Sequence, residues 1–590
     1  MEGKGYTQER NVQVLICLLK HHGIHRIIVS PGTTNLTFVE SIQHDNFFQI
    51  FSSVDERSAA YMACGIASET GEPVALSCTE ATASRNYYPG LTEAFYRKLP
   101  ILAITSTRNL GNSGFGIPQH IDRSAHANDV VKMSVQIPSF STEEDEWIYT
   151  IQMNRAILEL NHHGCGPVHI NLSTTYNPYY GVETIKEPLY VDRYDHRSTR
   201  LPKIPYGQTV IYMGEHAKWS NELTEQVDEF CERYNAVVLY DQSGKCNSKY
   251  GVSAALTTTQ DLYTFSGSNI DVLLYIGNIS GAYMKLTPKQ VWRVNPDGEL
   301  RDTFGKLRYV FEMEEVEFFR TYNKIAERND PEKRSTSCYD SWVREDERLR
   351  SKISDIPFSN VWLAQQICGK LPQNSRLFLG ILNSLRSWNY FAKPEQVDCF
   401  CNTGGFGIDG GVSTLVGASI VAPDKLFFGV FGDLGFFYDM NVLGNREVQN
   451  NIRVLLVNNG KGAEFKNYFH DAAKFGDDAD KFVAAAGHYG NKSPLLVKHY
   501  AEDLGYTYYS ASTKEEFLAH MDDFVNPQMQ NKPILYEVFT SDREESQANY
   551  VMRHLDDNKK LSTKEIARSM IQKTLGDQGI QSVKRILGKQ

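Results

Sequence analysis

Residues 426–434 (LFFGVFGDL) and residues 453–461 (RVLLVNNGK) each join a short apolar run to a polar dipeptide. Each run has the length of a buried strand and ends in residues that are typical of turns. Asp433 lies at the end of the first stretch, and Asn459 follows it by 26 positions, which leaves room for one helix between two strands. Strands that alternate with helices are the building unit of α/β folds, so this region is predicted to form a parallel sheet.

The same alternation of apolar runs and helical patterns occurs in three segments of the chain. We expect strands at 25–29, 73–77, 101–105 and 168–171, at 209–213, 236–240, 272–276 and 291–294, and at 376–379, 426–430, 453–457 and 534–539. The predicted domains are residues 1–190, 195–340 and 350–540, followed by a polar, helix-prone tail at 541–590 that is rich in Lys and Arg. The first and third segments are candidates for two copies of one fold.

The composition is that of a soluble globular protein, with 41% hydrophobic and 22% charged residues. A net charge of −10 argues against a nucleic-acid surface, which is normally basic. No run of 18 apolar residues occurs, and the first ten residues (MEGKGYTQER) lack the apolar core of a secretory signal. The 10 cysteines lack the paired spacing of zinc sites or disulfide frameworks. We therefore expect a cytoplasmic protein with reduced thiols and no nucleic-acid or membrane partner.

The dipeptides Gly432-Asp433 and Asn458-Asn459 would meet at one edge of the predicted sheet, because parallel strands present their carboxyl ends together. Mg²⁺ prefers hard oxygen ligands, which a carboxylate, an amide oxygen and a backbone carbonyl provide. Gly432 would let the backbone approach a phosphate at the start of the following helix. Either dipeptide alone is a common turn, but their spacing favours a magnesium–diphosphate site.

A Gly-Asp pair followed at this distance by Asn-Asn resembles the thiamine-diphosphate-dependent enzymes. That resemblance implies that Asp433, Asn459 and the carbonyl oxygen of Lys461 hold Mg²⁺ against the diphosphate of thiamine diphosphate, with Gly432 and Leu434 beside it. Leu434 stands where this family usually has glycine.

Glu56 is the candidate for the acid that activates such a cofactor. It follows an apolar run that ends at Val54 and opens a helix rich in small residues. A carboxyl group beside the pyrimidine ring nitrogen needs apolar surroundings, because burial raises its pKa and favours proton sharing. The alternative is that Glu56 is a helix-capping carboxylate.

Several further motifs resemble this family, from residue 10 to residue 540. They imply three parallel-sheet domains: a pyrimidine domain, a central domain and a diphosphate domain. They also imply active sites between the chains of a homodimer or homotetramer. The resemblance assigns cofactor contacts to Ser30, Pro31, Gly32, Thr79, Tyr88, Gly407 and Ile408, catalytic roles to Glu56 and Gln119, and substrate contacts to Arg108, Asn383, Ser384 and Thr403. Ile408 would be the apolar wedge between the two cofactor rings; without the glycines around it, an ordinary core residue would be preferred.

Within the family, the similarity is strongest to the menaquinone-pathway branch, which joins a unit from 2-oxoglutarate to isochorismate. Arginine suits such dicarboxylates, yet this chain has Thr33-Thr34 in place of that branch's Ser-Arg, Thr403 in place of an arginine, and Ala282-Tyr283 near the place of its Lys-Arg pair. We therefore expect a thiamine-diphosphate-dependent 2-oxo-acid decarboxylase or carboligase whose acceptor is not isochorismate. The alternatives are the menaquinone-pathway reaction itself, an acetolactate-synthase-like carboligase, a simple decarboxylase and an inactive cofactor-binding subunit.

Glu464 follows Asn459 by five positions and has two interpretations. It is either a general acid or base near the cofactor or an exposed helix carboxylate.

Overall fold

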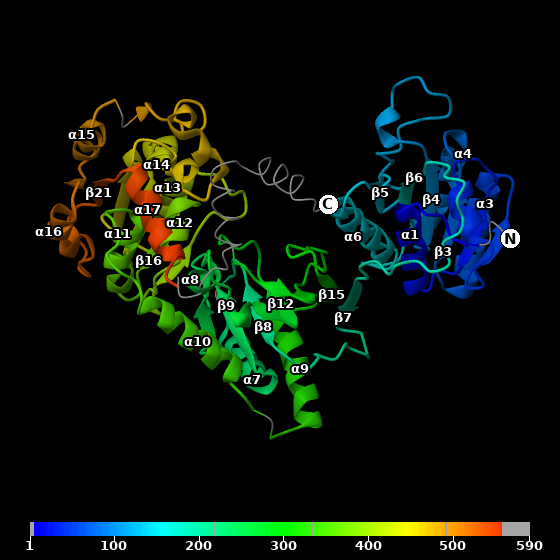
Figure 1. Ribbon diagram of the computed structural model, residues 1–590, viewed down its shortest axis with the longest axis horizontal. Coiled ribbons are helices and arrows are strands. Elements are labelled where there is room, and N and C mark those ends of the chain that lie inside the picture. The colour runs from blue at the N-terminus through cyan, green and yellow to red at the C-terminus, as the bar shows by residue number, and fades with distance from the viewer. Residues whose placement is uncertain (1–4, 218, 283, 333, 490–491, 557–590) are drawn as a thin grey trace, which may run out of the picture. The chain divides into compact units, whose positions relative to one another are not determined.

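The computed structural model describes residues 5–217, 219–282, 284–332, 334–489 and 492–556 (Figure 1). Tyr283 and the basic residues expected in the tail beyond 556 lie outside these ranges. The chain divides into two compact units, Met1–Lys203 with Gln290–Glu314, and Ile204–Lys289 with Glu315–Gln590.

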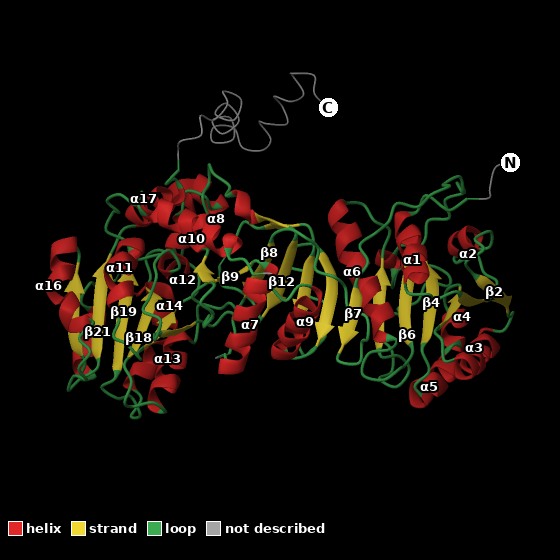
Figure 2. Ribbon diagram, turned by 90° about the horizontal axis from the view of Figure 1, so that it is seen from below, coloured by secondary structure: helices red, strands yellow, loops and turns green. Residues whose placement is uncertain are grey.

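The first unit contains a six-stranded parallel sheet with helices on both faces. Its strands are β1 (Arg26–Val29), β2 (Gln49–Ser52), β3 (Val74–Cys78), β4 (Ile101–Thr107), β5 (Met133–Ile137) and β6 (Val168–Ser173), in the order β2-β1-β3-β4-β6-β5. One face carries α1 (Arg10–His21), α2 (Leu36–Ile42) and α6 (Glu143–Glu159), and the other carries α3 (Glu56–Thr70), α4 (Thr82–Asn86) and α5 (Tyr88–Arg97) (Figure 2).

Small residues bring α3 and α5 together beneath this sheet. Ala59, Ala60 and Ala63 of α3 are fully buried. A Cβ added to Gly90 of α5 would lie 2.4 Å from the Cβ of Ala60, so only glycine permits this approach. The close packing fixes the start of α3, where Glu56 lies.

The first unit also contains the parallel strands β14 (Val291–Val294), β15 (Leu307–Glu312) and β7 (Asp192–Asp195), paired in that order. The second unit begins with the parallel strands β10 (Gly251–Ser253), β9 (Ala236–Tyr240), β8 (Thr209–Met213) and β12 (Val272–Ile276), and a small pair, β11 (Asn269–Ile270) and β13 (Thr287–Pro288). The helices of this region are α7 (Asn221–Tyr234), α8 (Ala255–Thr258), α9 (Glu315–Asn329) and α10 (Ser337–Arg350).

The last sheet of the second unit repeats the topology of the first. Its strands are β16 (Arg376–Leu379), β17 (Asp398–Phe400), β18 (Phe427–Gly432), β19 (Ile452–Asn458), β20 (Thr507–Ala511) and β21 (Ile534–Phe539), in the order β17-β16-β18-β19-β21-β20. Counted along the chain, both sheets therefore have the order 2-1-3-4-6-5, as expected of two copies of one fold.

Helices cover both faces of this sheet as well (Figure 2). One core includes residues of α11 (Asn360–Ile367), α12 (Asn383–Trp388), α16 (Lys514–Phe524) and α17 (Asp542–Arg553). The other includes residues of α13 (Gly411–Ile420), α14 (Asp433–Asp439) and α15 (Leu496–Asp503). Ala548 and Met552 of α17 are fully buried, so the described start of the expected tail belongs to the core.

The predicted α/β class with parallel sheets is confirmed, and every strand expected from an apolar run is present. No helix within the described ranges combines the length and apolar character needed to cross a membrane. All ten cysteines are free thiols.

Candidate active site

A cavity in the second unit lies at the carboxyl edge of the last sheet. Loops that follow β16, β17, β18 and β19 all reach it. Nine residues expected in the site line it: Asn383, Ser384, Gly407, Ile408, Gly432, Asp433, Leu434, Asn459 and Lys461. These residues come from four separate loops, so the strand order of the sheet is what gathers them.

Asp433 is a buried carboxylate at the first position of α14. Its exposed fraction is 5%, and burial raises its pKa to about 7, against the opposing effect of backbone N–H groups such as that of Leu434. Within the described ranges, no basic side chain forms an ion pair with it. The buried Oδ1 atom of Asn459 has no hydrogen-bond partner among the described residues. A buried carboxylate without a cation and an amide oxygen without a donor, both lining one cavity, are the arrangement that a divalent cation would satisfy.

Lys461 and Ile408 complete this end of the cavity. The Lys461 ammonium is bound to Asp480 Oδ2 at 2.7 Å and Asp542 Oδ2 at 3.3 Å, so its charge is already balanced. Ile408 is 37% exposed, which excludes the interpretation of Ile408 as an ordinary core residue. A Cβ on Gly435 would lie 3.0 Å from the Ile408 carbonyl oxygen, so Gly435 allows the Ile408 loop to pack on the start of α14.

Glu56 in the first unit does not cap its helix. Asp55 has that role, since its side chain accepts hydrogen bonds from the backbone N–H groups of Arg57 (2.9 Å) and Ser58 (3.4 Å). The Glu56 carboxylate is half-buried, and Asn86 donates a long 3.4 Å hydrogen bond to it. The capping interpretation therefore belongs to Asp55, and Glu56 remains available for a ligand.

The loop after β1 lies against the residue that follows β3. A Cβ on Gly32 would meet the Cβ of Thr79 at 2.5 Å, so glycine is required for this contact. Thr79 Oγ1 lies 2.5 Å from Thr34 Oγ1. Of the two residues that precede Gly32, Ser30 is buried and Pro31 is exposed. The loops after β1 and β3 therefore pack closely at the carboxyl edge of the first sheet.

Three further residues expected in the site, Tyr88, Arg108 and Gln119, also lie in the first unit. The Tyr88 hydroxyl lies 2.8 Å from His126 Nδ1 and also accepts from Arg85. Arg108 donates from Nε to the Tyr176 hydroxyl at 3.0 Å. Gln119 is exposed and has φ 66°, a left-handed conformation that costs a non-glycine residue free energy and is enriched at functional sites.

Comparison with known proteins identifies the family. A model of the thiamine pyrophosphate enzyme N-terminal, thiamine-pyrophosphate-binding domain matches residues 10–126. Over 91% of its length, this chain is 30% identical to the 2-succinyl-5-enolpyruvyl-6-hydroxy-3-cyclohexene-1-carboxylate synthase of Bacteroides fragilis and 31% identical to that of Bacteroides thetaiotaomicron, covering 97% of each. The chain belongs to the thiamine pyrophosphate enzyme family. The synthase of Flavobacterium psychrophilum is 28% identical over 84% of this chain and 93% of its own.

The cavity of this thiamine pyrophosphate enzyme suits the cofactor of its family, thiamine diphosphate with a divalent metal ion. Asp433 and Asn459 would offer their side-chain oxygens to the ion, and Lys461 its carbonyl oxygen. The apolar side chain of Ile408 would contact the cofactor rings. The start of α14, directly after Gly432, would face the diphosphate, since helix N-termini favour anions.

Beyond the metal end, the cavity contains polar residues on rigid elements. Leu382 adopts φ 65° and ψ −118° between β16 and α12, a strained turn that places Asn383 and Ser384 at the start of the helix. Ser384 Oγ accepts from Asn360 Nδ2 at 3.2 Å, and Asn360 Oδ1 accepts from Trp388 Nε1 at 3.0 Å. Thr403, an expected substrate contact, is buried and does not line this cavity.

Two carboxylates that line the cavity received no firm role from the sequence. Glu464 is 8% exposed, which excludes the exposed helix carboxylate considered for it. Glu545 of α17 is 2% exposed, and burial raises its pKa to about 7. Its sequence context, SDREES, is that of an ordinary acidic first turn, so no local signal could have identified it.

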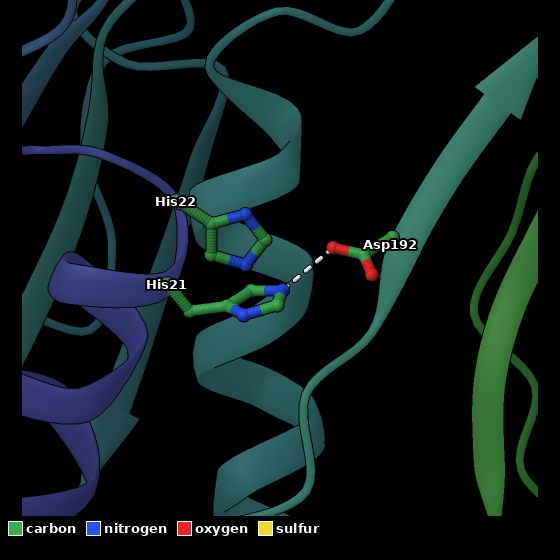
Figure 3. A group of neighbouring side chains, drawn as sticks. All are labelled: His21, His22 and Asp192. Atoms are coloured by element: carbon green, nitrogen blue, oxygen red, sulfur yellow. Dashed lines mark hydrogen bonds and ion pairs between the residues drawn. The ribbon is translucent and has the colours of Figure 1, made fainter. Parts of the chain in front are cut away.

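A second group of titratable residues lies in the first unit (Figure 3). His21 Nε2 lies 2.7 Å from Asp192 Oδ1, and Arg308 Nη1 lies 3.0 Å from Asp192 Oδ2. His22 points toward the same carboxylate region, and burial lowers its pKa to about 4, with a further lowering from neighbouring His21. The spacing of His21, His22 and Asp192 would admit a metal, but Arg308 already balances Asp192. We interpret the group as a structural ion pair beside a neutral, partly buried histidine.

The metal role of Asp433 predicts a specific effect of Asp433→Asn. Removing the charge should weaken Mg²⁺-dependent thiamine diphosphate binding about a hundredfold, because a desolvated charge pair is lost. The melting temperature without ligands should stay equal or rise, because a buried unpaired carboxylate is removed. Calorimetric titration and thermal melting measure both, with exposed Asp424→Asn as the matched control. Unchanged cofactor affinity would contradict the assignment.

The lowered pKa of His22 predicts a pH-dependent stability. The pKa of His22 is about 4 in the folded state and about 6.5 in the unfolded chain. Between these pH values the unfolded chain binds more protons than the folded state, so the free energy of unfolding is highest above pH 6.5 and falls as the pH is lowered toward 4. His22→Gln should reduce the loss of unfolding free energy between neutral pH and pH 5 by about 2 kcal/mol. Urea titrations at both pH values measure the free energy of unfolding, with the exposed His44→Gln as control. An equal change of this free energy with pH in the two variants would refute the prediction.

Proposed function

We propose that this chain forms a 2-succinyl-5-enolpyruvyl-6-hydroxy-3-cyclohexene-1-carboxylate product by decarboxylating 2-oxoglutarate and joining the four-carbon unit to isochorismate. The observation that carries the proposal is the extent of the similarity, 30–31% identity over 91% of this chain, to Bacteroides synthases that bear this name. The succinyl group of that product requires a dicarboxylic 2-oxo acid as donor.

The residues described above support the chemistry of such a reaction. When bound, thiamine diphosphate supplies a nucleophilic carbon and an electron sink for decarboxylation. Glu56 is proposed to share a proton with the pyrimidine ring nitrogen, and Asp433, Asn459 and the Lys461 carbonyl to hold the metal on the diphosphate. Gln119 is proposed as a second catalytic residue. Ile408 would fix the angle between the cofactor rings, so that proton transfer becomes intramolecular.

The sequence-based expectation of an acceptor other than isochorismate has no support. It depended on hydroxyl side chains replacing basic ones, but the Thr34 hydroxyl is occupied by Thr79 Oγ1 and by the Ser106 carbonyl at 3.1 Å. Thr403 is buried outside the cavity of the second unit. The relatives favour the alternative, and we adopt isochorismate as the proposed acceptor.

The assembly of the site is also part of the proposal. Glu56 and Asp433 belong to different sheets and would bind opposite ends of one cofactor. By resemblance to the family, we propose that the first-sheet domain of one chain faces the last-sheet domain of another, in a homodimer or a larger homo-oligomer. The pyrimidine, central and diphosphate domains would have the bounds expected from the sequence.

The proposed reaction predicts coupled turnover of two substrates. The holoenzyme should release labelled CO₂ from 2-oxoglutarate carrying ¹³C at its C1 carboxyl, and should consume isochorismate in equal amount. Mass spectrometry of the product and of CO₂ measures both, with Asp433→Asn protein as a control. Release of CO₂ from 2-oxoglutarate or pyruvate while isochorismate is unchanged would contradict the proposed acceptor.

The role of Glu56 predicts a separation of binding from activation. Glu56→Gln should slow hydrogen–deuterium exchange at the cofactor C2 by about a hundredfold, the size of a general acid–base contribution, and leave cofactor affinity unchanged. Nuclear magnetic resonance of quenched samples measures the exchange. Glu69→Gln, an exposed position near the end of the same helix, is the control. Exchange at the wild-type rate in Glu56→Gln would rule out this role.

A further inference from the structure

Glu464 lines the cavity and forms an ion pair with an arginine that is not itself a lining residue. Arg386 of α12 donates from Nη1 to Oε1 of Glu464, which lies in the 3-10 helix Ala463–Lys466. The Glu464 side chain is 10% exposed and that of Arg386 is 24% exposed. The pair is therefore largely removed from water, where its electrostatic effect on a ligand is strongest.

The second oxygen of Glu464 is also held. With the Asn383 amide assigned to satisfy its neighbours, Nδ2 donates to Glu464 Oε2 at 2.6 Å, and Oδ1 accepts from the Glu464 N–H at 3.0 Å. Asn467 Nδ2 donates to Oε2 at 3.4 Å. Glu464 is thus fixed from both sides, and its contacts with Asn383 do not depend on Arg386.

This ion pair changes the charge that a carboxylate-bearing substrate encounters. An arginine is well suited to a substrate carboxylate, because its guanidinium offers paired donors and a permanent charge. Here Arg386 lies behind Glu464, which balances its charge, and the Lys461 ammonium is engaged by Asp480 and Asp542. An incoming carboxylate must therefore replace Glu464 at Arg386 or approach a neutral pair.

We infer that Glu464 determines substrate specificity by acting as an internal competitor for Arg386, so that it lowers the affinity of the site for a substrate carboxylate. The inference rests on the proposed function for the identity of the substrates, both of which carry carboxylates beyond the reacting carbon. It assigns no step of bond making or breaking to Glu464. A role in merely supporting Arg386 would predict the opposite effect of its removal.

The test compares the wild-type holoenzyme with Glu464→Gln, Arg386→Met and the double variant. Rates of CO₂ release give KM for 2-oxoglutarate and for pyruvate, which lacks the distal carboxylate, and separately for isochorismate at saturating donor. Glu464→Gln should lower KM for the substrate whose carboxylate reaches Arg386 by about tenfold and leave KM for pyruvate unchanged. The gain should vanish in the double variant, because it acts through Arg386. Glu447→Gln, in the exposed pair of Arg446 with Glu447, is the matched control.

Binding measurements keep the inference separate from the proposed function. Calorimetric titration of the same holoenzymes with glutarate and with butyrate needs no turnover, and Glu464→Gln should bind glutarate about tenfold more tightly, with butyrate unaffected. If the wild-type protein does not convert 2-oxoglutarate and isochorismate, the proposed function is wrong. The comparison of glutarate affinities still tests the inference in that case. A weaker or unchanged affinity for glutarate, or an equal change for butyrate, would overturn it.

Discussion

Parallel strand pairing is the constraint on which this molecule depends. In a parallel sheet every strand delivers its following loop to the same edge, so residues far apart in the chain meet there without further contacts. The loops after β16, β17, β18 and β19 supply the cavity of the second unit in this way. The side chains at this edge can be polar and strained because the sheet below them is apolar on both faces.

The repeated strand order also gives the first and last sheets corresponding loops at their carboxyl edges. Glu56 follows the second strand of the first sheet, and Ile408 follows the second strand of the last sheet, so the two occupy corresponding loops. The first loop ends in a helix start with a half-buried carboxylate, and the second is a glycine-rich turn with an apolar side chain. The same frame thus presents two different chemistries in corresponding loops, as the roles proposed for Glu56 and Ile408 require.

The sequence predicted the inner strands of the first and last sheets well, because they are buried on both faces and consist of continuous apolar runs. Strands such as β2, β5, β17 and β20 were missed, and each lies at the edge of its sheet, where burial is partial and no such run is needed. Asp433 and Asn459 were recognisable because their spacing encodes one helix and one strand. Glu545 and the pair of Arg386 with Glu464 were not, since their significance arises from contacts between distant elements. Thr403 shows the converse: a position chosen by resemblance alone does not line the cavity.

Three buried carboxylates line the cavity, and each has different partners. Glu464 is balanced by the guanidinium of Arg386 and by two side-chain amides. Glu545 accepts from the Thr540 hydroxyl at 2.8 Å and the Asn360 N–H at 3.0 Å, yet burial still raises its pKa to about 7. Asp433 has backbone donors but no cation from the described chain, and so has the most to gain from a bound ion. We therefore propose the metal at Asp433 and not at the other two carboxylates. A second cation beside Glu464 would meet Arg386, and Glu545 is already hydrogen-bonded, whereas the Asn459 oxygen in the same cavity as Asp433 has no donor among the described residues.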